Sequence, residues 1–188
     1  NEGLAGPPFL ASLIHAWHLA ILGRPAEAHE AIATIAERCK AESQPFPLIQ
    51  ALTHWNFIET DLDMDPEVIA ARGEEVRAMS GRHEMAWFFM GWVQQTWADA
   101  KRGNHDAAIE LADAVCTRAR SSRAAVTDGK HFMLATDACL TSGHPTKALS
   151  TAEAGLRFCR TNLGRFAESA VLRLKGEALL SLQRREEG

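Results

Sequence analysis

His15 and His18 have a spacing that suits metal binding, because side chains three residues apart on a helix share one face. His29, on the next predicted helix, is the nearest further candidate. A third ligand at a spacing typical of a zinc site is not apparent. We therefore assign no metal to these histidines and expect them to be partly buried and hydrogen-bonded, or exposed.

Asp61, Asp63 and Asp65 alternate as the first ligands of a calcium-binding loop do, but the glycine and the closing glutamate of such a loop are missing. A helix end followed by a helix cap explains this acidic stretch more simply. The sequence also lacks a nucleophile elbow, a P-loop and a GxGxxG motif. We predict that the chain is not an enzyme and binds no cofactor, and a metal-dependent enzyme is the less favoured alternative.

The cysteines Cys39, Cys116, Cys139 and Cys159 are far apart and form no pair of metal-binding spacing. Each falls in an apolar helical register, which predicts reduced, buried thiols. The sequence has no signal peptide and no run of about 18 apolar residues. We therefore expect a cytoplasmic protein that does not enter a membrane.

The composition fits one folded domain spanning residues 1–188, with 46% hydrophobic and 23% charged residues. The formal net charge of −4 gives no general attraction to phosphate backbones or anionic lipid. We therefore predict that this region contacts neither nucleic acid nor membrane.

A short pattern recurs four times along the chain. It reads LGRPAEAHEAI from Leu22, DMDPEVIAARG from Asp63, RGNHDAAIELA from Arg102 and SGHPTKALSTA from Ser142. The equivalent positions are Gly23, Met64, Gly103 and Gly143, which are 41, 39 and 40 residues apart. This regular period indicates a repeat architecture.

Each copy of the pattern predicts a helix end, a left-handed glycine, and a proline or polar residue that opens the next helix. In the second copy Met64 replaces the glycine. There we expect Asp65 to cap a helix that has Pro66 at its first position.

The helix before each turn is apolar over most of its circumference, as in MAWFFMGWVQQTWADA, whereas the helix after it carries one apolar stripe. A stack of antiparallel helical hairpins explains this difference, because first helices are packed on two sides and second helices cover the outside. We predict an all-α fold, a tetratricopeptide-like right-handed superhelix of about nine helices. The expected helices are 8–22, 25–42, 47–62, 66–80, 83–102, 105–120, 123–142, 145–162 and 165–184.

Aromatic residues recur at equivalent depths in the first helices. Trp17 and Trp97 both lie six residues before their turn glycine, and Trp92 and Phe132 both lie eleven before theirs. We expect these rings to form an aromatic seam in the core.

Polar side chains on the first helices are the candidate ligand-binding residues. They face either a neighbouring helix or a concave groove that suits an extended peptide or a small ligand. For each residue alone, solvation or an intramolecular bond is the competing explanation. The candidates are His18, Asn56, Glu59, Gln94, Gln95, Asp137, Arg173 and Glu177.

Four segments carry a family resemblance: AWHLAILGRPAEA, PFPLIQALTHWNF, GWVQQTWADAKRGNHDAAI and, above all, AESAVLRLKGEALL. They resemble the C-terminal repeat region of large bacterial signalling ATPases. In that family a class III nucleotide cyclase or a DNA-binding domain is followed by a STAND-type ATPase and then by tetratricopeptide-like repeats. The cyclase's metal-binding carboxylates and the ATPase's phosphate-binding loop are absent from this sequence.

The resemblance implies a non-catalytic module that binds a protein, a peptide or a small effector and serves as the sensor or scaffold arm of a cyclase-linked or transcriptional regulator. Its partners would include the other domains of the parent chain. A free-standing peptide-binding adaptor is the alternative.

The last helix raises three further expectations. Arg173, Lys175 and Glu177 form its polar face, and Gly176 allows a neighbouring helix to approach closely. The segment LQRREEG falls where the next turn of the repeat is due, so we expect the chain to be a fragment of a longer polypeptide. An uncovered apolar face on this helix makes a homodimer a further prediction.

Overall fold

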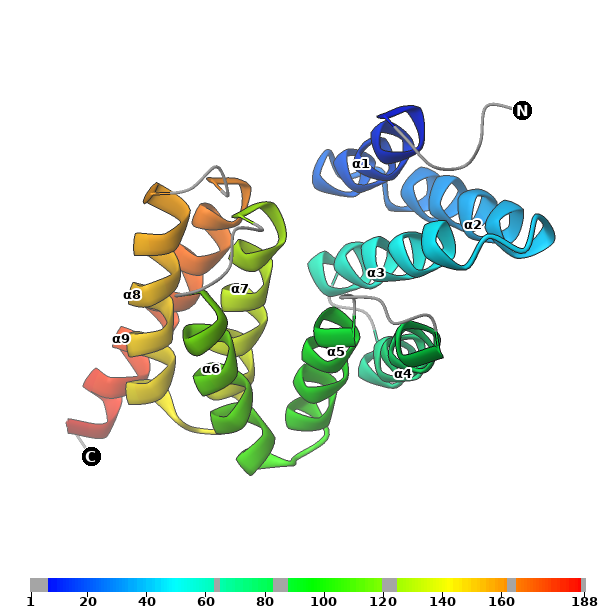
Figure 1. Ribbon diagram of the computed structural model, residues 1–188. Coiled ribbons are helices and arrows are strands. Elements are labelled where there is room, and N and C mark those ends of the chain that lie inside the picture. Colours follow the sequence, from blue (N-terminus) through cyan, green and yellow to red (C-terminus); the bar gives the residue numbers. More distant parts are fainter. Residues whose placement is uncertain (1–6, 63–64, 83–87, 120–124, 162–164, 187–188) are drawn as a thin grey trace. The chain divides into compact units, whose positions relative to one another are not determined.

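The computed structural model describes the whole chain except residues 1–6, 63–64, 83–87, 120–124, 162–164 and 187–188 (Figure 1). Its described part contains nine α-helices and no strand, which confirms the all-α prediction. The helices are α1 (Pro7–Ile21), α2 (Pro25–Ala41), α3 (Pro45–Asp61), α4 (Pro66–Arg82), α5 (Phe88–Lys101), α6 (His105–Ala119), α7 (Ala125–Thr141), α8 (Pro145–Thr161) and α9 (Glu168–Glu186). A single 3₁₀ turn, η1 (Arg165–Ala167), precedes α9.

The chain forms two compact units, Asn1–Gln95 and Thr96–Gly188, and the boundary between them falls within α5. In the first unit α2 packs on both α1 and α3, α3 packs on α4, and α1 also packs on α3. In the second unit α7 packs on α6, α8 and α9, and α8 packs on α6 and α9. Contacts to the next helix and to the next but one are what stacked helical hairpins make.

Three of the predicted turn glycines adopt the left-handed conformation, with φ values of 75° at Gly23, 98° at Gly103 and 74° at Gly143. In each turn the following amide donates a hydrogen bond of 2.8–3.0 Å to the carbonyl five residues earlier, which satisfies the end of the helix. Met64 lies outside the described residues. Its neighbour Asp65 behaves as predicted, since its Oδ1 accepts a 2.9 Å hydrogen bond from the amide of Glu67.

The turn between α2 and α3 falls in the predicted break between helices 25–42 and 47–62, but it contains no glycine, so the repeated turn pattern does not predict its conformation. Ser43 takes the left-handed conformation there, with φ of 53°, and the Gln44 amide donates to the carbonyl of Cys39 at 2.9 Å. The turn therefore closes as the glycine turns do. It also lets α3 begin at Pro45, two residues before the predicted start, because proline suits the first helical position.

Each unit has its own apolar core. The predicted core tryptophans are buried, Trp17 in the first unit and Trp97 in the second. Trp92 is half-buried and lies near Phe89, with ring centroids 5.5 Å apart. No helix in the described part of the chain is both long enough and apolar enough to cross a membrane.

Glycines permit two close helix contacts. A Cβ added at Gly73 on α4 would lie 2.9 Å from the carbonyl oxygen of Gly91 on α5, and one added at Gly91 would lie 2.7 Å from the carbonyl oxygen of Gly73. A Cβ at Gly155 on α8 would lie 2.7 Å from the Cβ of Phe132 on α7. At the first contact the backbones of α4 and α5 touch directly, and at the second the backbone of α8 touches the Phe132 side chain. Both contacts depend on the absence of a Cβ at the glycine.

The expectation for Gly176 is wrong. A Cβ added there would meet no described atom within 4 Å, so this glycine accommodates no close helix. Residue type alone predicted a close contact, but the glycine lies on an open face of α9.

Gly73→Ala tests the contact between α4 and α5. The added methyl group would clash with the backbone of α5, which cannot rotate away, so we expect a loss of roughly 1–3 kcal/mol in the free energy of unfolding. Gly81→Ala on the same helix is the matched control, because its added Cβ meets open space. That variant should be neutral or more stable by up to about 1 kcal/mol. Equal midpoints for the two variants in urea unfolding would contradict the contact.

Candidate functional site

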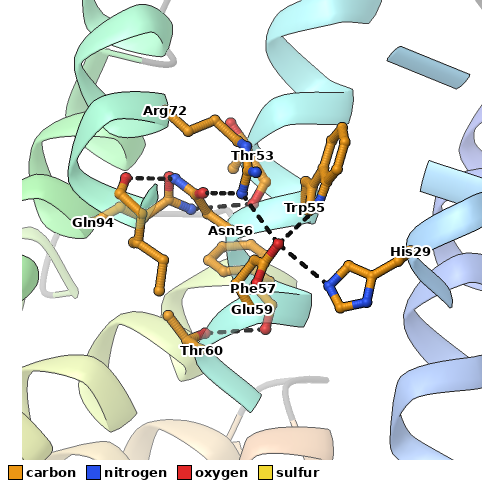
Figure 2. Close-up of polar contacts among 10 residues, drawn as sticks. His29, Thr53, Trp55, Asn56, Phe57, Glu59, Thr60, Arg72 and Gln94 are labelled. Carbon is orange, nitrogen blue, oxygen red and sulfur yellow. Dashed lines mark hydrogen bonds and ion pairs between the residues drawn. The ribbon is translucent and has the colours of Figure 1, made fainter. Parts of the chain in front are cut away.

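The structure brings three of the eight predicted site residues together. Asn56 and Glu59 on α3 and Gln94 on α5 are buried in one polar cluster of the first unit (Figure 2). Arg72 on α4 joins them. We call this set of four residues the α3–α5 polar cluster.

The Asn56 side chain is the centre of the cluster. Its amide nitrogen donates to Gln94 Oε1 at 2.8 Å and to the carbonyl of Ile69 at 3.2 Å, and its Oδ1 accepts from Arg72 at 2.9 Å. Gln94 in turn donates to the carbonyl of Thr53 at 3.1 Å. Both N–H donors of the Asn56 amide are thereby bonded, and Oδ1 accepts one of the two hydrogen bonds it can accept, which suits a side chain with no exposed surface.

Glu59 gathers three donors on one carboxylate oxygen. Its Oε1 accepts from Trp55 Nε1 at 2.8 Å and lies 3.3 Å from His29 Nε2 and 3.6 Å from a terminal nitrogen of Arg72 (Figure 2). Its Oε2 is buried and has no hydrogen-bond partner among the described residues. A buried carboxylate needs such partners, so Glu59 ties α2 and α4 to α3.

Arg72 is not among the predicted site residues, because all of those lie on first helices and Arg72 lies on α4, a second helix. Its guanidinium lies 4.3 Å from the centroid of the Trp55 ring, and its side chain is only 13% exposed. Burial lowers the pKa of Arg72, while Glu59 and Glu75 act to raise it. The sequence did hold a signal, because Arg72 lies three residues after buried Ile69 and four before buried Val76, on the apolar stripe of α4.

Two further candidates make bonds between helices of their own unit. Gln95 on α5 accepts a hydrogen bond from Arg77 on α4. In the second unit, Asp137 on α7 accepts from Trp97 Nε1 at 2.7 Å and pairs with Lys101 at 2.8 Å. These contacts give both side chains an intramolecular role.

The remaining candidates lie on the surface. His18 on α1 is exposed. Arg173 and Glu177 form an ion pair one turn apart on α9, with side chains 64% and 47% exposed. Exposed pairs of this kind are screened by solvent and leave both groups available to a partner. Ligand binding by any of the eight residues stays a prediction.

Three of the four cysteines do not have the environment of reactive thiols. Cys39, Cys139 and Cys159 are buried thiols, and Cys116 is a half-buried one. Burial raises the pKa of the Cys39 and Cys159 thiols, and that of Cys139 to about 12. Because the thiolate is the nucleophile, these three thiols are inert at neutral pH.

No group of three or more His, Cys, Asp or Glu side chains that could hold a metal ion occurs within the described residues. His15 and His18 are both exposed on α1. His29 instead lies against Glu59, as described above.

In comparisons with known proteins, no family model, no curated protein and no solved structure matches this chain.

A double-mutant cycle tests the bond between Asn56 and Gln94. Asn56→Leu leaves buried acceptors on Gln94 and Ile69 without a donor, so we expect a loss of roughly 2–4 kcal/mol in the free energy of unfolding. Gln94→Leu should cost a similar amount. The double variant should lose at least ~1 kcal/mol less than the sum, because each single change already removes the shared bond. Strict additivity in urea unfolding would contradict this geometry.

The buried histidines predict a loss of stability in mild acid. Burial lowers the pKa of His54, against its Nδ1 hydrogen bond of 2.8 Å to the Gln50 carbonyl, and burial likewise lowers the pKa of His131. As the pH falls, these histidines take up protons in the unfolded chain near pH ~6.5, before they do so in the folded chain. The free energy of unfolding therefore keeps its full value above that pH and decreases as the pH drops below it.

Thermal unfolding between pH 7.5 and 5.0 checks this prediction. His54→Leu should reduce the pH dependence, while His18→Leu, a change at an exposed position, is the matched control. An unchanged slope for His54→Leu would show that protonation of His54 does not oppose folding.

Proposed function

We propose that this chain is a non-catalytic, tetratricopeptide-like repeat module whose helical hairpins form a right-handed superhelix. It binds a protein or a small effector, in the cytoplasm, as the sensor or scaffold arm of a bacterial signalling ATPase of the STAND type. The ATPase would be linked to a nucleotide cyclase or to a transcriptional regulator. The sequence resemblance described above suggests this parent.

One observation carries the binding role: two helices expose rows of large apolar side chains. On α1 these are Leu10, Ile14 and Ile21, which are 45%, 38% and 57% exposed. Their spacing of four and seven residues places them along one face of the helix.

On α9 the exposed apolar side chains are Leu172, Leu179 and Leu180, which are 45%, 49% and 55% exposed. Apolar faces of this kind in repeat proteins are covered by further repeats, by capping elements or by partners. The exposed apolar rows therefore support a role in binding other protein surfaces. We propose that other domains of the parent chain cover them, and a second copy of this chain is the alternative.

The α3–α5 polar cluster supports a sensor role. Its bonds join α3 to α4 and α5, so a change in the angle between these helices would break several buried hydrogen bonds together. An effector that binds one arrangement better than the other would shift the balance between them by its difference in affinity.

The reading frame of the gene tests the proposed parent. We expect the codons upstream of Asn1 to continue, in frame, into a nucleotide-binding domain that contains a P-loop. A stop codon followed by a start codon close to this position would contradict the proposal and favour the free-standing adaptor. An upstream frame without a P-loop would exclude the signalling ATPase and leave the repeat module itself in place.

A further inference from the structure

A hollow of about 500 Å³ lies among α6, α7 and α8 of the second unit. This volume is within the range of small-molecule sites in proteins. None of the eight predicted site residues lines it.

The apolar part of the hollow contains the rings of Phe132 and Phe158. Both are more than nine-tenths buried, and their centroids lie 5.7 Å apart at an interplanar angle of 42°. Gly155 brings α8 against Phe132, as described above, and so fixes this ring beside the hollow. Ala154 also lines the hollow.

The positive charge of the hollow comes from Arg157. Lys147 also lines it, but the ammonium group of Lys147 is bound to the carboxylate of Asp113. The Arg157 side chain is exposed and has no hydrogen bond or ion pair to any described residue. One unopposed guanidinium matches a ligand with a single negative charge better than a dianion such as a phosphate monoester.

Thr151 adds a second indication of a ligand. It lines the hollow, is only 1% exposed, and its Oγ1 has no hydrogen-bond partner among the described residues. A buried hydroxyl without a partner costs free energy. An oxygen of a bound ligand would supply the missing partner after a small local adjustment.

We propose that this hollow binds a small hydrophobic monocarboxylate. The apolar body of the ligand lies on Phe132 and Phe158, the carboxylate pairs with Arg157, and the Thr151 hydroxyl donates to a ligand oxygen. The proposal does not depend on the parent protein proposed above, because it concerns α6–α8 alone.

Titration of the ¹⁵N-labelled chain with 3-phenylpropionate, followed by NMR, tests the site. Saturable shifts should appear for amides of α6, α7 and α8, with a Kd in the millimolar range or tighter, since so small a ligand has limited binding energy. The neutral 3-phenylpropan-1-ol and the cationic 3-phenylpropylammonium should bind at least tenfold more weakly. Absence of saturable shifts, or equal affinity for the three probes, would overturn the proposal.

Variants locate the binding groups. Arg157→Leu should weaken the affinity for 3-phenylpropionate about tenfold or more, because it removes a charge-assisted pair. Arg165→Leu, at an exposed arginine that does not line the hollow, should leave it unchanged. Equal effects of the two variants would show that general charge attraction explains the binding, and this result would contradict the proposed site.

Thr151→Val separates a ligand role from a folding role. In the free protein it should raise the melting midpoint, because it removes an unpartnered buried hydroxyl, and it should also weaken binding of 3-phenylpropionate severalfold. A raised midpoint with unchanged affinity would remove Thr151 from the site. Unchanged circular dichroism of each variant shows that it is folded.

Discussion

The Asn56 side chain, buried in the first unit, sets the condition that its neighbours must meet. A primary amide with no exposed surface has to find donors and acceptors within the protein, and Asn56 finds them on α4 and α5. Apolar packing alone tolerates small slides of one helix along another, whereas these bonds are satisfied in only one register. The amide therefore selects the register of α3, α4 and α5 from the many that their apolar faces would allow.

The glycine contact between α4 and α5 is the complement of this constraint. The carbonyl oxygens of Gly73 and Gly91 lie where any Cβ on the opposite helix would have to be, so the helices approach more closely than residues with side chains allow. The same approach places Gln94, three residues after Gly91, within reach of Asn56. The glycines thus permit the close approach of the helices, and the buried amides fix the register in which they pack.

Much of the fold could be predicted from the sequence, since helix periodicity and turn glycines are local signals. Helix boundaries that fall among the described residues agree with the pattern to within a few residues, while the predicted boundaries at 83, 120, 123 and 162 lie outside the described residues. The left-handed conformation of Ser43 was not predicted, because residues other than glycine rarely adopt it. The partners of Asn56, Glu59 and Gln94 could not be predicted, since a polar residue on an apolar helix faces either solvent or a neighbour, and one sequence does not distinguish these. The prediction of a close helix contact at Gly176 was wrong for a similar reason, because the residue type does not show whether that face of the helix packs against a neighbour.

Both units contain a hydrogen bond from a tryptophan to an aspartate between successive first helices, but the polar groups near this bond differ. Trp17 donates to Asp61 between α1 and α3, and Trp97 donates to Asp137 between α5 and α7, so in each unit an indole and a carboxylate join successive first helices. In the first unit the neighbouring polar groups bond to one another, although Glu59 Oε2 is buried without a hydrogen-bond partner among the described residues. In the second unit Arg157 and the Thr151 hydroxyl have no such partners among the described residues. What favours small-molecule binding in the second unit is that the unpartnered Thr151 hydroxyl lines a hollow beside the buried rings of Phe132 and Phe158.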